Sequence, residues 1–324
     1  MSGGEAARGR LRCKLRENQR GWGKEEPGSR RAMKTDRPSV LKPLAAALAV
    51  ALFGLGPAQA DEKASSGEHE QLDTEHIFGF TEGAYIGEKG EQEIENTAVE
   101  RFGKSRAYSF FENETAFRYV IPGDIRFSFG TLVEGYAIEQ GPGPSQRTGF
   151  GFEGATGEVR WQPLQQSKSL PLDLTLSFSP QWSRIDEATG EEADTYSGQA
   201  AILATVRIVP DKLFLGFNLI CEPAVTRDLD GWQNDSSFEV SLAAAYAVVP
   251  DVFVGAEIRH LNGSEQGLFS SHALYFGPSL YAKLSETFAI KVAWSEQVPD
   301  GPNGRLDLEN FERHQAVLLL VKSF

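Results

Sequence analysis

After a polar N-terminal part, the sequence alternates between large apolar residues and small or polar ones. In the stretch 172–179 (LDLTLSFS), leucine and phenylalanine occupy every second position. Because neighbouring side chains of a β-strand point to opposite faces, this pattern predicts strands with one apolar and one polar face. The same alternation recurs at 155–161, 238–247, 274–282 and 288–295, so the chain is predicted to be all-β.

The polar face of these strands is rich in glycine, alanine, serine and threonine, with glutamate and arginine between them. The outward face of a soluble β-sandwich carries polar side chains instead, and its bulky residues point inward. A crowded polar interior with a bulky apolar exterior is typical of a transmembrane β-barrel. After residue 60, no apolar run approaches the roughly 20 residues that a membrane-spanning helix requires, so strands must cross any bilayer.

Short connections rich in proline, glycine and aspartate alternate along the chain with longer polar segments. The short connections are 121–124, 163–171, 209–211, 249–251 and 284–286. The longer segments are 139–149, 184–197, 222–236, 261–272 and 297–311. This arrangement predicts a transmembrane antiparallel up-and-down β-barrel with short periplasmic turns, longer outer loops and about 12 strands, within a range of roughly 10–14. The predicted strands are 92–101, 107–121, 125–138, 150–162, 172–183, 198–209, 212–221, 237–249, 251–260, 273–284, 287–296 and 312–324.

The N-terminal part has the organisation of an export signal. Residues 33–60 combine a basic start, a short apolar run and an Ala-x-Ala motif that ends at Ala60, as secretory signal peptides do. Cleavage after Ala60 would leave a mature chain that starts at Asp61. Residues 1–32 are interpreted as a start assigned too far upstream of Met33, or as a disordered extension, because their composition cannot bury a core.

Residues 61–91 are predicted to form a periplasmic N-terminal segment that precedes a barrel of residues 92–324. Within it, the stretch 76–86 (HIFGFTEGAYI) looks like a strand, which would be the thirteenth. An odd strand would leave the two ends of an up-and-down barrel on opposite sides of the membrane. We therefore expect this stretch to lie in or under the barrel.

Charge and cysteine content restrict the possible functions. The chain has a formal net charge of −13, and residues 1–60 hold 12 basic and 5 acidic residues. The remainder therefore has 32 − 12 = 20 basic and 45 − 5 = 40 acidic residues, a net charge of −20, which excludes a nucleic-acid partner. Cys221 alone remains after export, so neither a disulfide nor a cysteine metal site is expected, and no cofactor is predicted.

The parity of the predicted strands sends a set of charged side chains into the lumen. Ion pairs between neighbouring strands are one interpretation of this set, and a cation-preferring pore lining is the other. The candidate lumen charges are Glu93, Glu95, Glu112, Glu114, Arg118, Arg126, Glu134, Glu158, Arg160, Arg207, Glu257 and Arg259, together with Asp173, Glu239 and Lys291.

The C-terminal residue Phe324 follows Ala316, Leu318 and Leu320 at alternate positions. This pattern resembles the signal that outer-membrane barrels present to their assembly machinery, which makes that machinery and outer-membrane lipid expected partners. Three further stretches, at 78–90, 112–115 and 253–257, resemble a family of uncharacterised proteobacterial outer-membrane β-barrels that are regarded as porins. The resemblance implies an outer-membrane location in a Gram-negative cell and a barrel fold, and it implies no activity.

Three functions are compatible with these features. The preferred one is a porin-like channel or transporter for small solutes that favours cations. The alternatives are a closed structural or interaction barrel and a barrel that hydrolyses lipids. A hydrolase would need a nucleophile beside a histidine, and only His272, next to Ser270 and Ser271, offers this in sequence. Because no G-x-S-x-G motif is present, we do not expect an enzyme.

Overall fold

The structure is a computed structural model that describes residues 73–139, 146–167, 170–187, 190–228, 231–265, 268–300 and 304–324. The N-terminal extension, the signal peptide and the cleavage site predicted within residues 1–61 lie outside the described residues. Across the described ranges, no helix is long and apolar enough to span a membrane.

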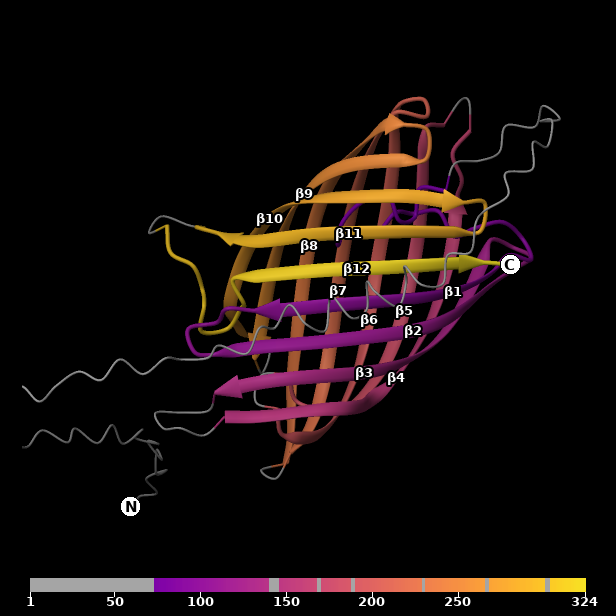
Figure 1. Ribbon diagram of the computed structural model, residues 1–324. Coiled ribbons are helices and arrows are strands. Elements are labelled where there is room, and N and C mark those ends of the chain that lie inside the picture. The colour runs from indigo at the N-terminus through magenta and orange to yellow at the C-terminus, as the bar shows by residue number, and fades with distance from the viewer. Residues whose placement is uncertain are drawn as a thin grey trace, which may run out of the picture. The chain divides into compact units, whose positions relative to one another are not determined.

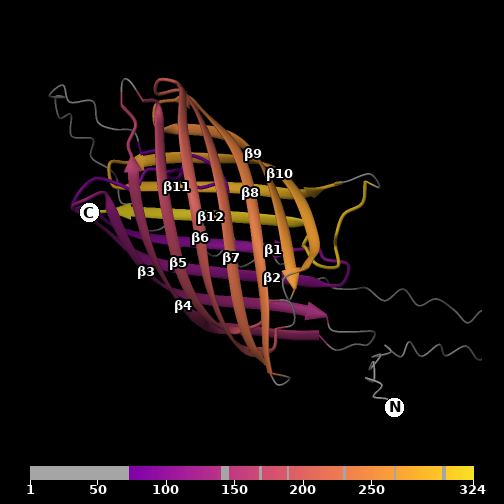
Figure 2. The same ribbon diagram turned by 180° about the vertical axis from the view of Figure 1, so that it is seen from behind.

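In the described residues, twelve antiparallel strands form a closed barrel. Each strand pairs with its neighbours in sequence, and β12 pairs with β1, so that yellow and indigo ribbons meet in Figure 1. Figure 2 shows the opposite wall, which includes β5 to β8. The predicted all-β, up-and-down barrel is thus confirmed. The strands are β1 (Gln92–Phe102), β2 (Tyr108–Ile121), β3 (Ile125–Glu139), β4 (Gln146–Leu164), β5 (Leu172–Ile185), β6 (Glu192–Val209), β7 (Leu213–Asp228), β8 (Gly231–Val249), β9 (Val252–Glu265), β10 (Leu268–Ser285), β11 (Phe288–Val298) and β12 (His314–Ser323).

Short turns gather at one end of the barrel, which we call the turn end, and the opposite end is the loop end. Three of these turns contain an aspartate in the left-handed region of backbone space: Asp124 and Asp211 with φ of 56°, and Asp251 with φ of 63°. Aspartate is one of the few residues other than glycine that adopt this conformation readily. The Pro-Asp and Pro-Gly-Asp sequences therefore mark sharp reversals between paired strands.

Toward the loop end, the strands extend further than the alternation predicts. Much of 184–197, 222–236 and 261–272, expected as loops, continues the β-ladders. Backbone pairing does not need an apolar face, and polar side chains can link strands in water. Thr195 and Thr226 share a hydroxyl hydrogen bond of 3.0 Å across β6 and β7. The predicted strands end where apolar alternation stops, whereas the ladders continue past that point.

The two faces of the wall differ as the alternation implies. On β5, Leu176 and Phe178 point outward and are 39% and 53% exposed. Asp173, Thr175 and Ser177 point inward and are buried. The outer wall is thus apolar and the inner wall is largely polar.

Residues 73–91, which we call the N-terminal segment, form no strand; most of 74–86 is buried inside the barrel, and 88–90 are exposed. The segment reverses on itself where the N–H of Gly83 donates to the carbonyl of Glu75 over 2.9 Å. A Cβ atom at Gly83 would lie 2.0 Å from the carbonyl oxygen of Thr74, so only glycine allows the two arms of this loop to approach. Ile77 and Phe78 of this loop are fully buried.

Candidate functional site: the lumen and the N-terminal segment

The carboxylate of Glu75 lies among three arginines of neighbouring strands. Arg118 of β2 donates to Glu75 over 2.8 Å. Arg126 of β3 and Arg160 of β4 donate to it over 2.7 and 3.0 Å. Glu75 and Arg126 are only 5% and 1% exposed. Burial alone would raise the pKa of the Glu75 carboxyl, but Arg126 and Arg118 outweigh burial and hold this pKa well below its usual range.

His76 extends the ion pairs to β1. Its Nε2 atom lies 2.9 Å from Oε1 of Glu95, and Arg118 pairs with the same carboxylate. Burial alone would lower the pKa of His76, but the carboxylates of Glu95 and Glu75 outweigh it and raise this pKa to about 8. His76 is therefore mostly protonated at neutral pH, and its charge holds the segment to β1.

Two more carboxylates, one from β4 and one from the N-terminal segment, complete this network. Glu158 accepts from Nε of Arg160 over 2.7 Å and from Arg126 over 3.3 Å. Glu82 of the N-terminal segment pairs with Arg160. Four carboxylates thus face three guanidiniums and one imidazolium, so their formal charges cancel. Without the N-terminal segment, the wall part of this network would have three arginines and the two carboxylates of Glu95 and Glu158, which leaves a net charge of +1.

The opposite wall holds the backbone of the segment. Glu257 of β9 accepts from the N–H groups of Phe80 and Thr81 over 2.9 and 2.8 Å. Gly79 makes this approach possible, because a Cβ atom there would lie 2.3 Å from Oε1 of Glu257. The guanidinium of Arg259 stacks on the ring of Phe80 at 4.3 Å and donates to Glu239 over 2.9 Å. In this second cluster, the carboxylate of Glu257 binds peptide N–H groups, whereas the guanidinium of Arg259 pairs with Glu239.

Hydroxyl and apolar contacts finish the docking. The N–H of Ala84 donates to Thr205 of β6 over 2.9 Å, and the hydroxyl of Thr175 donates to the Ala84 carbonyl. Ile77 and Phe78 belong to a buried apolar cluster supplied by strands β7 to β12. Its wall residues are Phe214, Ala243, Ala245, Phe253, Tyr281, Ala289, Leu319 and Val321. The N-terminal segment therefore meets inward-facing residues around the circumference of the barrel.

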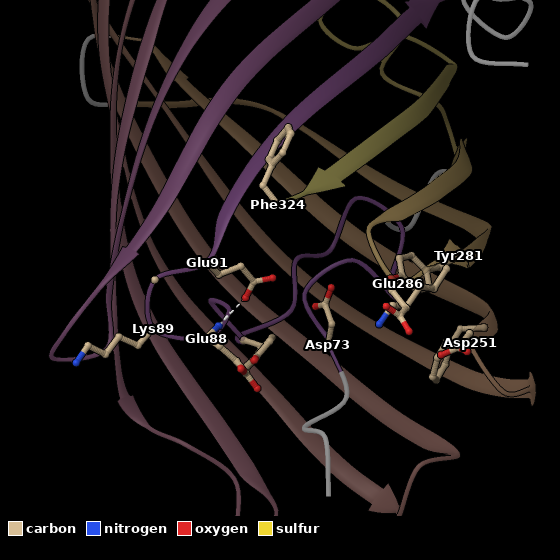
Figure 3. Close-up of a pocket in the computed structure, with 12 residues that line it drawn as sticks. Asp73, Glu88, Lys89, Glu91, Asp251, Tyr281, Glu286 and Phe324 are labelled. Atoms are coloured by element: carbon tan, nitrogen blue, oxygen red, sulfur yellow. Dashed lines mark hydrogen bonds between the residues drawn. The ribbon is translucent and has the colours of Figure 1, made fainter. Parts of the chain in front are cut away.

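Space remains on the turn-end side of the segment. A cavity of about 540 Å³ is lined by Asp73, Glu88, Glu91, Asp251 and other residues, and its labelled side chains are mostly acidic (Figure 3). Burial raises the pKa of Asp73 and of Glu91. The cavity thus opens between the segment and the turns of the wall.

The structure brings many predicted lumen charges together. Glu95, Arg118, Arg126, Glu158 and Arg160 join the network around Glu75, and Glu239, Glu257 and Arg259 form the second cluster. Other predicted charges make different hydrogen bonds, although Glu93 lies close to Glu75 and His76. Glu93 accepts from Ser323, Glu114 from Thr156, Asp173 from Gln162, and Arg207 donates to the Ser167 carbonyl at the turn end. Glu112, Glu134 and Lys291 are buried or partly buried in the wall.

Sequence reasoning missed Glu75, His76 and Glu82, because no strand parity applies to the N-terminal segment. It also missed Glu153, which is fully buried in the lumen. Leu132 pairs with Gly154 and Val133 with Phe152, so Glu153 is the extra residue of a β-bulge. On the N-terminal side of the bulge, odd-numbered residues of β4 face the lumen instead of even-numbered ones. The alternation after residue 155 could not reveal this change.

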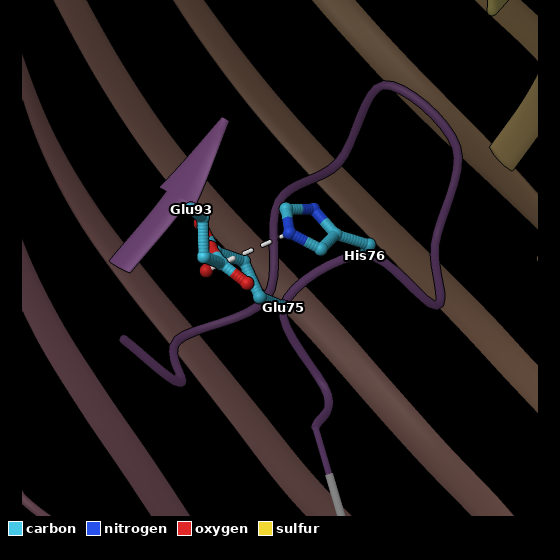
Figure 4. Close-up of side chains that lie close together, drawn as sticks. All are labelled: Glu75, His76 and Glu93. Carbon is cyan, nitrogen blue, oxygen red and sulfur yellow. Dashed lines mark ion pairs between the residues drawn. The ribbon is translucent and has the colours of Figure 1, made fainter. Parts of the chain in front are cut away.

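Glu75, His76 and Glu93 offer ligand atoms within 4.8 Å of one another, a spacing that a metal ion could use. Figure 4 shows Glu93 on β1 beside the two residues of the N-terminal segment. However, three guanidiniums already surround Glu75, and His76 pairs with Glu95. The positive charge that a metal would supply is therefore present, and the group serves to dock the segment.

Within the part of the chain that the structure describes, neither Ser270 nor Ser271 donates a hydrogen bond to His272. The hydroxyl of Ser270 donates to the carbonyl of Gly263 over 3.4 Å. His272 is exposed and lies 3.9 Å from Asp300. A nucleophile activated by this histidine would need a serine hydroxyl directed at its ring.

In fold, the chain is similar to an outer membrane channel from Pseudomonas putida F1, at 12% identity and a TM-score of 0.51, with 75% of this chain and 98% of that chain covered. It is also similar to the KdgM porin (11% identity, TM-score 0.42, 72% and 99% covered). The translocator domain of the autotransporter NalP from Neisseria meningitidis gives 9% identity and a TM-score of 0.44, with 74% and 91% covered. No curated protein matches the sequence. Residues 70–324 match the model of a family of unknown function, DUF6662, and the chain belongs to that family.

Proposed function

We propose that this protein is a porin-like channel or transporter for small solutes, in which the N-terminal segment acts as a plug. The observation that carries the proposal is the charge balance around Glu75. In the described residues, Glu95 and Glu158 of the wall pair with three wall arginines, and the charges balance when the carboxylates of a segment that is not part of the wall are added. A barrel that is closed for purely structural reasons could fill its lumen with side chains of its own strands.

Ion pairs of this kind suit a reversible contact. Buried charges lose hydration, and the gain from pairing often only compensates that loss, so the net stability of such a contact is small. Water and ions that enter the lumen could replace the partners of the wall arginines when the segment leaves. The similarity in fold to an outer membrane channel supports this proposal.

The proposed location is the outer membrane of a Gram-negative, proteobacterial cell. Export would use the signal peptide of residues 33–60, and Phe324 would direct assembly of the barrel. Exposed apolar residues on the outer wall, such as Phe129, Leu176 and Phe178, support contact with lipid. The proposed substrates are small solutes.

Cation preference is part of the proposal. Toward the loop end, Glu112, Glu134 and Glu153 lie beyond the neutral network and outnumber the cations near them. Acidic groups at a pore entrance favour cations, most strongly at low salt, where screening is weakest. Replacement of Glu112 and Glu114 by glutamine should therefore lower the permeability ratio of K⁺ to Cl⁻.

The burial of most of the plug favours a second candidate, a permanently closed barrel. Planar-bilayer recording distinguishes the two. We expect rare or partial openings in the natural protein and frequent openings in the Glu75→Gln variant, with Glu88→Gln as the matched control on the same segment. A silent Glu75→Gln variant whose plug is shown by labelling to be released would contradict the channel and support the closed barrel.

A further inference from the structure

Three carboxylates meet inside the barrel on the loop-end side of the plug. They belong to Glu112 of β2, Glu153 of β4 and Glu187 just after β5, and each has an oxygen within 4.8 Å of the others. Glu134 of β3 lies directly opposite Glu112 in the β2–β3 ladder. Four acidic side chains from separate elements therefore converge on one level of the lumen.

The positive charge beside this cluster is insufficient. Arg101 lies 3.1 Å from Glu187 and 4.0 Å from Glu112, and it is the cation that pairs with these carboxylates among the described residues. Like charges placed opposite each other in a ladder destabilise the sheet. One guanidinium leaves most of the acidic charge at this level uncompensated.

Glu153 gives independent evidence of a missing partner. Its side chain is 0% exposed, and both of its carboxylate oxygens lack a hydrogen-bond partner within the described part of the chain. Oε2 of Glu134 is also buried without a partner there. A buried, unpaired carboxylate is costly, so proteins normally provide a cation or a donor for it. The bulge in β4 turns Glu153 into this position, although a regular strand would direct it outward.

We propose that Glu112, Glu153 and Glu187 bind a divalent cation, with Glu134 beside them, and that the cation is of the calcium type. Calcium takes oxygen ligands at about 2.3–2.6 Å, so ligands on opposite sides of the ion can be up to about 5 Å apart. The spacing of the three carboxylates falls within that limit. The ligands include neither nitrogen nor sulfur, which disfavours zinc. A bound ion would join β2, β4 and the β5–β6 hairpin.

Calorimetric titration of the full chain in detergent with Ca²⁺ alone tests this site. We expect saturable binding of one ion with a dissociation constant on the order of 0.1–1 mM, as in other extracellular sites. Glu153→Gln should weaken binding at least tenfold, whereas Glu192→Gln, an exposed residue of the same hairpin, should bind like the natural protein. Glu187→Gln is a second test, because this exposed residue is not needed for the wall to fold.

Each outcome decides the proposal. A flat titration of the natural protein with Ca²⁺ up to about 10 mM, which is tenfold above the expected range of dissociation constants, would refute the site. Equal affinity in the natural protein, Glu153→Gln and Glu187→Gln would show that Ca²⁺ binds elsewhere, and would refute it too. A loss of binding in Glu187→Gln with unchanged heat-dependent mobility of the barrel would support it even if Glu153→Gln failed to fold.

Discussion

The most direct test of the plug is the replacement of Glu75 by glutamine. This change keeps the size of the side chain and removes the negative charge that Arg118, Arg126 and Arg160 share. The wall then keeps three guanidiniums against Glu95 and Glu158, with only Glu82 of the segment as a further acid. The docked state should lose stability because these guanidiniums remain buried beside a neutral amide.

The expected loss follows from the burial of the partners. Removal of one partner from a buried ion pair costs about 3–5 kcal/mol. Arg126 and Arg160 keep Glu158 as a partner, so the lower limit of about 3 kcal/mol applies. Because each 1.4 kcal/mol changes an equilibrium constant about tenfold, the ratio of undocked to docked plug should rise about 100-fold.

A buried cysteine in the plug reports undocking. Ala84 is fully buried, so Ala84→Cys can serve in a background where Cys13 and Cys221 are serine. A small maleimide should label this cysteine at a rate proportional to the undocked population. Glu75→Gln should increase the rate about 100-fold, and Glu88→Gln, an exposed carboxylate of the same segment, should leave it unchanged. Equal rates for both variants, in barrels with normal heat-dependent mobility, would refute the role assigned to Glu75.

Three further predictions use the same preparation. The pKa of His76 rises from 6.5 to about 8 on docking, so its stabilising effect is complete below pH 6.5 and is lost as the pH rises through 8. Because the reactive thiolate fraction also grows with pH, the labelling rate is divided by that of the same cysteine in a His76→Gln background. This ratio should increase between pH 6 and pH 9 by a factor that corresponds to about 2 kcal/mol, and a ratio that does not change with pH would contradict the role of His76. Gly83→Ala should release the plug at every pH, because its Cβ atom would meet the Thr74 carbonyl at 2.0 Å, and unchanged labelling would contradict the reversal. Leu176→Arg should destabilise the barrel in liposomes by about 2–4 kcal/mol, and equal costs for Leu176→Arg and Ser177→Arg in refolding titrations would contradict the register of β5.

The wall of this barrel was predictable because its signals are local. Alternation of side chains places Leu176 outward and Ser177 inward without knowledge of any partner strand. The Pro-Asp turns depend on the conformations of two or three adjacent residues, such as Pro210 and Asp211. A strand in an up-and-down barrel also pairs with its neighbours in sequence, so the order of strands needs no long-range information.

The plug was not predictable in the same way. Glu75 ends a polar stretch and His76 begins a stretch that looks like a strand, so neither position marks an ion pair. The partners of Glu75 are 43 or more residues away in sequence, and the partner of His76 is 19 residues away. Glu257 binds the N–H groups of Phe80 and Thr81. Because every residue except proline has a peptide N–H group, the sequence does not indicate which of these groups bind a carboxylate. The glycines at 79 and 83 were the available signal, since close backbone approach requires residues without a Cβ atom.

Strand parity identifies the charges that face the lumen but not the charges that neutralise one another. At the level of Arg126, the plug supplies Glu75 and Glu82, and the formal charges cancel. At the level of Glu153, strands and hairpin supply four carboxylates, and among the described residues Arg101 forms ion pairs with two of them. Release of the plug should therefore decide whether ions pass, and the acidic level should decide which ions pass. These two properties should respond to different substitutions, since no residue belongs to both levels.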